Sequence, residues 1–391
     1  MKLSSRIPGD WTPSPWSKRV EDLKRQAATG GKPLIDLTVS SPLSVGIQWE
    51  GSGILQALQE SEPWMNWKPD ACGSLRAREA VSRFLIRGEF VCDAGRLLLL
   101  PGTSDAYSLL FKVLCDPREV ILVPRPGYPL LDVLASLENL ECASYGLNLV
   151  DGAWRIDWES LNAAPHAKIL LVVNPNNPTG SVLSLEEWER LVSYCVAREM
   201  AIVVDEVFCD FPLDDMPVVP WNDYASRVPL FRLNGLSKSA GLPQVKLSWI
   251  WVGCPEADFS PLMAALEYVA DAYLGLSALA ESLAPVLLQN QAPYRDRVLE
   301  RMHVNLDVAR KALGSKVDDM PVPQGGWYLS FRCEGLDDEA FALELATEDG
   351  VLVLPGYFFD FAEDGWIVLS LLALPDVFSA GVEKIAKRLL Q

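Results

Sequence analysis

The sequence predicts an α/β protein with two domains. The large domain is expected to carry a mostly parallel sheet of the seven-stranded type covered by helices. The smaller α+β domain is expected to combine the N- and C-terminal parts of the chain. Short apolar runs alternate with longer amphipathic stretches from about residue 75 to 255, as in parallel sheets covered by helices. After Leu313 the pattern changes to isolated strands between helices, so we expect boundaries at 46–285 for the large domain and at 1–45 with 286–391 for the small one.

Composition narrows the classes of function. A chain of 391 residues is long enough for two domains, and its 49% hydrophobic and 22% charged residues are typical of globular proteins. The 52 acidic and 34 basic residues give a formal charge of −18, which disfavours nucleic acids and anionic membranes as partners. The polar N-terminus lacks a signal-peptide core, and no apolar run approaches the ~20 residues that span a bilayer. We therefore expect a cytoplasmic protein whose eight scattered cysteines stay reduced.

The elements of the large domain follow from the apolar pattern. Amphipathic stretches predict helices over 75–87, 106–114 and 184–198, the last opened by a capping box of Ser184 and Glu187. The short apolar runs predict strands over 96–100, 120–123, 168–173, 201–204, 230–233 and 247–252.

The remainder of the chain predicts the small domain. A helical region is expected over 261–313, with a break at Ala292-Pro293 because proline interrupts a helix. Strands are expected over 327–331 and 366–371, and helices over 338–346 and 375–390. The N-terminal segment with Trp11, Pro13, Pro15 and Trp16 is too rich in proline for a regular element, so we expect it to lie along a surface of this subunit or a partner.

Polar residues follow several of the predicted strands, at the sheet edge where open α/β sheets bind ligands. Gly102-Thr103-Ser104 at a strand-to-helix junction offers N–H groups and hydroxyls to an anion, although a plain capped helix has the same pattern. Asp205 ends an apolar strand, where a charge needs a partner. Lys238 lies among small residues, and the Asn174–Gly180 loop presents side-chain amides. With only two histidines and no CxxC pair, the chain lacks clustered zinc ligands and an iron–sulfur framework, so no metal site is expected.

Three motifs occur in a fixed order. They are Asn-Pro-Asn-Asn-Pro-Thr-Gly at 174–180, Asp-Glu-Val-Phe at 205–208 and Leu-Ser-Lys-Ser-Ala-Gly-Leu-Pro at 236–243. Asn177 and Asp205 are 28 residues apart, and Asp205 and Lys238 are 33 apart. The chain resembles the fold-type-I pyridoxal phosphate enzymes, the class I/II aminotransferases of the aspartate aminotransferase superfamily, over nearly its whole length.

The resemblance implies a role for each motif. Lys238 would be the catalytic residue, forming a Schiff base with the cofactor and moving a proton between the substrate Cα and the cofactor C4′. Asp205 would pair with the pyridinium nitrogen, Asn177 would donate to the phenolic oxygen, and Tyr128 would stack on the ring. The phosphate would be held by Gly102, Thr103, Ser104, Ser237 and Lys246.

Several positions depart from the family pattern. Phe208 stands where the family has a tyrosine, so the cofactor's phenolic oxygen loses a donor and the imine should keep its proton to higher pH. Lys246 replaces an arginine and loses the bidentate fork, although it keeps the charge. Gly235 replaces a serine, and Trp67 falls where relatives place a hydroxyl that reaches the partner subunit's phosphate.

The largest departure is Val368. Relatives place there the arginine that binds the substrate α-carboxylate, and a valine cannot take over that role. The substrate therefore lacks this carboxylate or meets another cation. The candidate cations are Arg125, Arg232, Arg6, Lys18 and Arg19.

The resemblance implies an aminotransferase that takes a small-molecule amino donor and an oxo-acid acceptor, with active sites formed between the subunits of a homodimer. Two alternatives stay open. One is a pyridoxal phosphate-dependent C–S lyase, and the other is a non-catalytic relative that binds the cofactor or senses a ligand. The substrate itself is not indicated.

Overall fold

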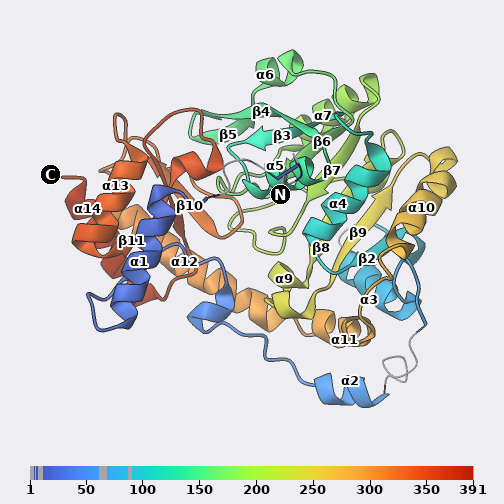
Figure 1. Ribbon diagram of the computed structural model, residues 1–391, viewed down its shortest axis with the longest axis horizontal. Coiled ribbons are helices and arrows are strands. Elements are labelled where there is room, and N and C mark those ends of the chain that lie inside the picture. The colour runs from blue at the N-terminus through green and yellow to red at the C-terminus, as the bar shows by residue number, and fades with distance from the viewer. Residues whose placement is uncertain (1–3, 5, 8–11, 61–67, 87–89, 391) are drawn as a thin grey trace.

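The computed structural model describes residues 4, 6–7, 12–60, 68–86 and 90–390, and it confirms the predicted α/β fold (Figure 1). The large sheet has eight strands in the order β2-β9-β8-β7-β6-β3-β4-β5. Their bounds are β2 (Leu97–Leu100), β3 (Val120–Arg125), β4 (Glu141–Val150), β5 (Ala153–Ile156), β6 (Ile169–Val173), β7 (Ala201–Asp205), β8 (Leu230–Gly235) and β9 (Ser248–Gly253).

Five neighbouring strands of this sheet, β4, β3, β6, β7 and β8, run parallel. β9 is antiparallel to both of its neighbours, and β5 adds an eighth, antiparallel strand at the edge beside β4. The two-residue loop between β4 and β5 is Asp151-Gly152, and both residues have positive φ, the geometry that favours a tight hairpin. The sequence prediction had no strand over this hairpin, because β4 mixes buried and exposed residues without a regular alternation.

Helices cover both faces of the sheet because its strands are apolar on both sides. Leu170 and Val172 of β6 face one core, and Ile169, Leu171 and Val173 face the other. The first core is covered by α3 (Leu75–Leu85), α6 (Trp158–Ala163), α7 (Leu185–Ala197), α8 (Trp221–Ala225) and α11 (Ala278–Gln289). The second is covered by α4 (Thr103–Leu114), α5 (Leu130–Leu137) and α10 (Glu256–Asp271).

The chain ends form a second α+β unit around a core of its own (Figure 1). Its three-stranded antiparallel sheet has the order β10 (Tyr328–Arg332), β13 (Trp366–Ser370), β12 (Leu354–Pro355), while β1 (Ile35–Asp36) pairs in parallel with β11 (Val351–Leu352). The helices are α1 (Pro15–Ala28), α12 (Ala292–Leu313), α13 (Asp338–Glu344) and α14 (Pro375–Arg388). The boundaries at 45/46 and 285/286 stay a prediction.

Two local predictions were wrong. The proline-rich N-terminal segment contains α1, which begins at Pro15. Proline is tolerated in a first turn, and the Ser14 hydroxyl caps the helix by accepting from the Ser17 N–H. The helical region after residue 256 is also interrupted at 272–277, where Leu274 and Gly275 have positive φ, and not only before Ala292. The predicted capping box of Ser184 and Glu187 is confirmed.

The described residues also bear on what the sequence indicated about membrane spans, cysteines and metal ligands. None of the described helices is long and apolar enough to cross a membrane. No disulfide bond joins any of the eight cysteines, all of which lie in the described ranges. In the described part of the chain, no three histidine, cysteine or acidic side chains are placed to share a metal ion. Trp11 and Trp67 lie outside the described residues.

Candidate active site

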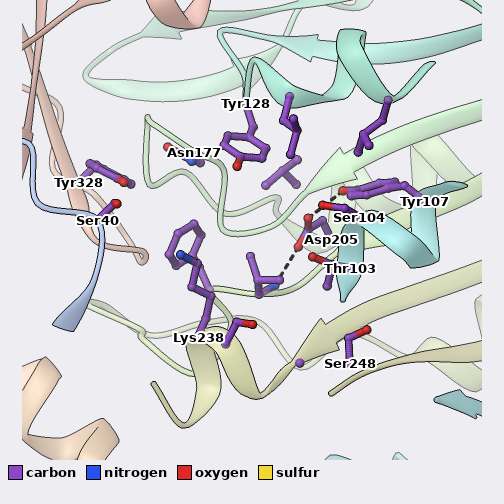
Figure 2. A pocket seen from close by; sticks show the side chains of 17 residues that line it. Ser40, Thr103, Ser104, Tyr107, Tyr128, Asn177, Asp205, Lys238, Ser248 and Tyr328 are labelled. Carbon is purple, nitrogen blue, oxygen red and sulfur yellow. Dashed lines mark hydrogen bonds between the residues drawn. The ribbon is translucent and has the colours of Figure 1, made fainter. Parts of the chain in front are cut away.

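A cavity of about 300 Å³ opens where the parallel strands of the large sheet end (Figure 2). Val173, Asp205 and Gly235 line it as the last residues of β6, β7 and β8. The small domain contributes Tyr328 from β10, and the segment after β1 contributes Ser40. The full lining is Ser40, Thr103, Ser104, Tyr107, Tyr128, Leu130, Leu134, Val173, Asn177, Asp205, Val207, Phe208, Gly235, Ser237, Lys238, Ser248 and Tyr328.

The structure brings together eight of the ten residues that the sequence indicated for the site. They are Thr103, Ser104, Tyr128, Asn177, Asp205, Phe208, Ser237 and Lys238. Gly102 and Lys246 do not line the cavity but lie next to each other. A Cβ atom added to Gly102 would stand 3.2 Å from the Lys246 Nζ and 3.0 Å from an Asp105 carboxylate oxygen.

This edge of the site is built to attract an anion. Gly102 caps the N-terminus of the 12-residue helix α4, whose first residues Thr103 and Ser104 enter the cavity. The unpaired N–H groups of a helix start carry partial positive charge, and the Lys246 ammonium adds a full one. Asp105, also in the first turn of α4, does not line this cavity but a neighbouring one.

The asparagine-rich loop after β6 orders itself with its own side chains. Asn174 Oδ1 accepts from the Leu183 N–H at 2.9 Å, and Asn176 Oδ1 accepts from the Thr179 hydroxyl at 3.0 Å. Asn177 lies in the cavity wall at 8% exposure, and its Oδ1 has no hydrogen-bond partner among the described residues. Buried amides are normally paired, so the Asn177 side chain is available to a bound molecule.

Asp205 is buried and holds two internal hydrogen bonds. Its Oδ2 accepts from the Tyr107 hydroxyl at 2.7 Å, and its Oδ1 accepts from the Val207 N–H at 3.0 Å (Figure 2). Burial raises the pKa of the carboxyl, while the Val207 N–H, the Tyr107 hydroxyl and the charge of Lys238 oppose that rise. A buried carboxylate with donors on both oxygens is suited to hold a cationic group that enters the cavity.

Tyr107 is a site residue that the sequence reasoning missed. It is 3% exposed and lies one turn after Thr103 on α4, so both side chains reach the same cavity. Two features of the sequence could have indicated Tyr107. It follows Thr103 of the predicted anion site at i+4, and it places a hydroxyl in a mostly apolar helix.

Lys238 lies on the short helix α9 (Leu236–Ser239), and its side chain enters an aromatic corner. Its Nζ is 4.8 Å from the centroid of the Trp327 ring and 5.8 Å from that of Phe208. Burial lowers the pKa of this amine, and the charge of Asp205 partly opposes the shift. A lysine with a lowered pKa keeps more of its neutral, nucleophilic form at neutral pH.

Aromatic rings close the remaining walls. Phe208 is 4% exposed and makes edge contacts with Trp327 and Tyr328, at centroid distances of 5.3 and 6.4 Å. Tyr128 is partly exposed at the opposite wall (Figure 2). Burial raises the pKa of Tyr328 to about 12, so its hydroxyl stays protonated at neutral pH.

The structure explains the glycine at position 235. A Cβ atom there would stand 2.8 Å from the Ser248 Cβ and 2.9 Å from the Leu247 carbonyl oxygen. The backbone at Gly235 is extended, with φ −176°, so the restriction is steric and not conformational. A serine at this position would require β9 to move.

None of the cations proposed to replace the missing arginine lines the cavity. Arg125 pairs with Asp132 and Asp360. Arg232 is buried in a 2.7 Å ion pair with Glu206 and lines a different cavity. Lys18 and Arg19 are exposed on α1, and Arg6 donates to the Leu137 carbonyl.

Comparisons with known proteins identify the family of this chain. The family described as aminotransferase class I and II matches residues 54–385. The chain is 26% identical to the tyrosine aminotransferase of Homo sapiens over 360 residues, which cover 88% of this chain and 78% of the relative. It is 28% identical to an S-alkyl-thiohydroximate lyase of Arabidopsis thaliana over 307 residues, or 73% of this chain and 64% of the relative. An alanine aminotransferase from Pyrococcus furiosus has the same fold, with a TM-score of 0.87 and 20% identity over the whole of both chains.

Proposed function

This chain belongs to the aminotransferase class I and II family, and we propose that it is a pyridoxal 5'-phosphate-dependent aminotransferase whose Lys238 binds the cofactor covalently. The residues of the cavity fit that cofactor. Asn177 presents its side-chain amide in the wall, Thr103, Ser104 and Ser237 are placed at the cavity, and the buried Asp205 carboxylate forms no ion pair among the described residues.

Each type of contact that the cofactor needs has a residue to supply it. The phosphate would be held by Thr103, Ser104, Ser237 and the α4 N-terminus, with Lys246 adding charge. Asn177 would donate to the phenolic oxygen, and Tyr128 would cover the ring. The cofactor, when bound, supplies an electron sink for the carbon that carries the substrate amine.

The protein groups would then control the protons. The Asp205 carboxylate would keep a proton on the ring nitrogen, since a buried anion favours a bound cation. The Lys238 amine would take a proton from the substrate carbon and return it, because its lowered pKa lets it act as a base near neutral pH. Phe208 would exclude water but donate nothing to the phenolic oxygen.

The observation that carries this proposal is the convergence of Lys238, Asp205 and Asn177 on one cavity from three different strand ends. The match to a lyase keeps a second outcome in view, because elimination at a C–S bond would use the same cofactor residues. A non-catalytic role is disfavoured by the amine of lowered pKa beside a buried carboxylate.

A half-reaction assay tests the proposal. The cofactor-loaded protein is mixed with pools of amines and amino acids, and the absorbance of the bound cofactor is followed. Conversion to pyridoxamine phosphate supports transamination, whereas release of ammonia and an oxo acid without conversion supports a lyase. No spectral change with any pool would contradict both activities.

Lys238→Ala tests whether Lys238 is the residue that binds the cofactor covalently. The variant should lose the absorbance of the covalently held cofactor and all turnover, because no other described lysine lines the cavity. Lys112→Ala is the control, since Lys112 is a partly buried lysine that pairs with Glu138 outside this cavity. A borohydride-reducible cofactor adduct in Lys238→Ala would refute the assignment.

We also propose a cytoplasmic homodimer. Tyr268, Tyr273 and Leu274 are 82%, 67% and 68% exposed at the end of α10 and just after it, and an apolar surface of this kind favours association. Light scattering after size-exclusion chromatography should give about twice the mass of 43.2 kDa. A monomer at all concentrations would contradict the proposal.

A further inference from the structure

The cavity is poor in positive charge at the end away from α4. Among its described lining residues the only cation is Lys238, and the only anion is Asp205. In Figure 2, Ser40 and Tyr328 lie at one end of the cavity and Thr103, Ser104 and Asp205 at the other, with Lys238 between them. The end formed by Ser40 and Tyr328 therefore offers hydroxyl groups and no charge.

The small sheet behind this end is also neutral. Val368 is fully buried on β13 and pairs directly with Ser330 of β10. Residues of one strand alternate between its two faces. The Ser330–Val368 pair therefore lies on the same face of the sheet as Tyr328, two residues further along β10. The Ser330 hydroxyl is 1% exposed and has no hydrogen-bond partner among the described residues.

The arginines of the surrounding walls are already neutralised. Arg125 is held between Asp132 and Asp360. Arg232 is held by Glu206 and packs 4.5 Å from the Phe90 ring centroid. Moving the Arg232 guanidinium into the cavity would leave Glu206 without its partner, which is costly because that pair is buried.

A carboxylate bound between Ser40 and Tyr328 would thus lose its water and gain only neutral donors. An amide or ester loses far less hydration than a carboxylate, and it can accept from a hydroxyl and fill the same space. The two hydroxyls can donate to a carboxylate, but the described residues at this end include no cation to offset the loss of its hydration.

We propose that the amino donor carries a neutral hydrogen-bonding group, an amide or ester, where an α-amino acid carries its free carboxylate. This inference rests on the proposed function, because it assigns Lys238 to the cofactor.

The test uses matched pairs with the cofactor-loaded enzyme: L-alanine with L-alaninamide, and L-tyrosine with L-tyrosinamide. Dissociation constants come from the absorbance change of the bound cofactor on titration, and half-reaction rates are measured separately. We expect each amide to bind at least about tenfold more tightly than its acid. Equal or tighter binding of the acids would overturn the inference and indicate a cation supplied from elsewhere.

An amino acid and its amide differ in the basicity of the amine, and this difference is the same for every protein variant. Comparing the ratio of their two dissociation constants between variants of Val368 therefore removes its effect. Val368→Arg should shift this ratio toward the acid by about tenfold, and the matched control Val368→Leu should not shift it. An unchanged ratio in a folded Val368→Arg variant would overturn the inference that this face of the small sheet borders the bound substrate. If that variant does not fold, the wild-type comparison decides, and acids that bind as tightly as their amides overturn the inference.

Failure of the proposed function would look different. In that case the cofactor absorbance would respond to neither member of any pair, and every variant would behave alike. A response to both members, with the acids preferred, would retain the aminotransferase and reject only the neutral substrate.

Discussion

Replacing Tyr107 with phenylalanine would remove one hydroxyl from the site and leave the ring in place. This hydroxyl donates to Asp205 Oδ2 at 2.7 Å, and both side chains are buried. A hydrogen bond to a charged group contributes about 1.5–3 kcal/mol, so kcat/KM is expected to fall about ten- to a hundredfold. The loss comes from weaker stabilisation of the carboxylate that would face the ring nitrogen.

Tyr107→Phe should also change the pH dependence of the reaction, in a direction that the contacts of Asp205 determine. The Tyr107 donor favours the charged form of Asp205 and holds its pKa down against burial, which raises it. Without the donor the pKa of Asp205 rises further, so the active carboxylate is lost at a higher pH as the solution is acidified. Because one pKa unit corresponds to about 1.4 kcal/mol, the acid limb of the kcat/KM profile should move upward by about one to two units.

The assay is the pH dependence of the half-reaction for wild type, Tyr107→Phe and Tyr145→Phe. Tyr145 is the matched control, because its buried hydroxyl donates at 2.8 Å to a neutral group, the Leu171 carbonyl. Tyr145→Phe should lower the free energy of unfolding by about 1 kcal/mol and leave the acid limb in place. An acid limb at the same pH in wild type and Tyr107→Phe would refute the role given to Tyr107.

Three further changes test other parts of the site. Asp205→Asn should fold and bind cofactor but lose most activity, since a neutral amide does not hold a proton on the ring nitrogen; near-normal half-reaction rates would be incompatible with that role. Phe208→Tyr should lower the pKa of the cofactor–Lys238 linkage, because the new hydroxyl can donate to the phenolic oxygen; a spectral pH titration showing no shift or a rise would count against it. Gly235→Ser should lower the free energy of unfolding by about 1–3 kcal/mol, because its Cβ would meet Ser248, and unchanged denaturant unfolding would contradict this packing.

The order of elements and most of the polar side chains that line the cavity could be predicted from the sequence. The strands of the parallel sheet are buried on both faces, so each is a continuous apolar run, and the residues that end them meet at one edge. For that reason Asp205, Asn177 and Lys238 could be expected in one site before their distances were known.

Other features depend on contacts between distant segments, which local sequence does not encode. Ser40 and Tyr328 reach the cavity because the small domain packs over the strand ends, and Tyr107 meets Asp205 across 98 residues of chain. Arg125 could be listed as a substrate clamp from its position beside Tyr128, but only the tertiary structure shows it paired with acidic side chains. Local patterns thus determined which segments form the site, whereas long-range packing decided which charges remain free inside it.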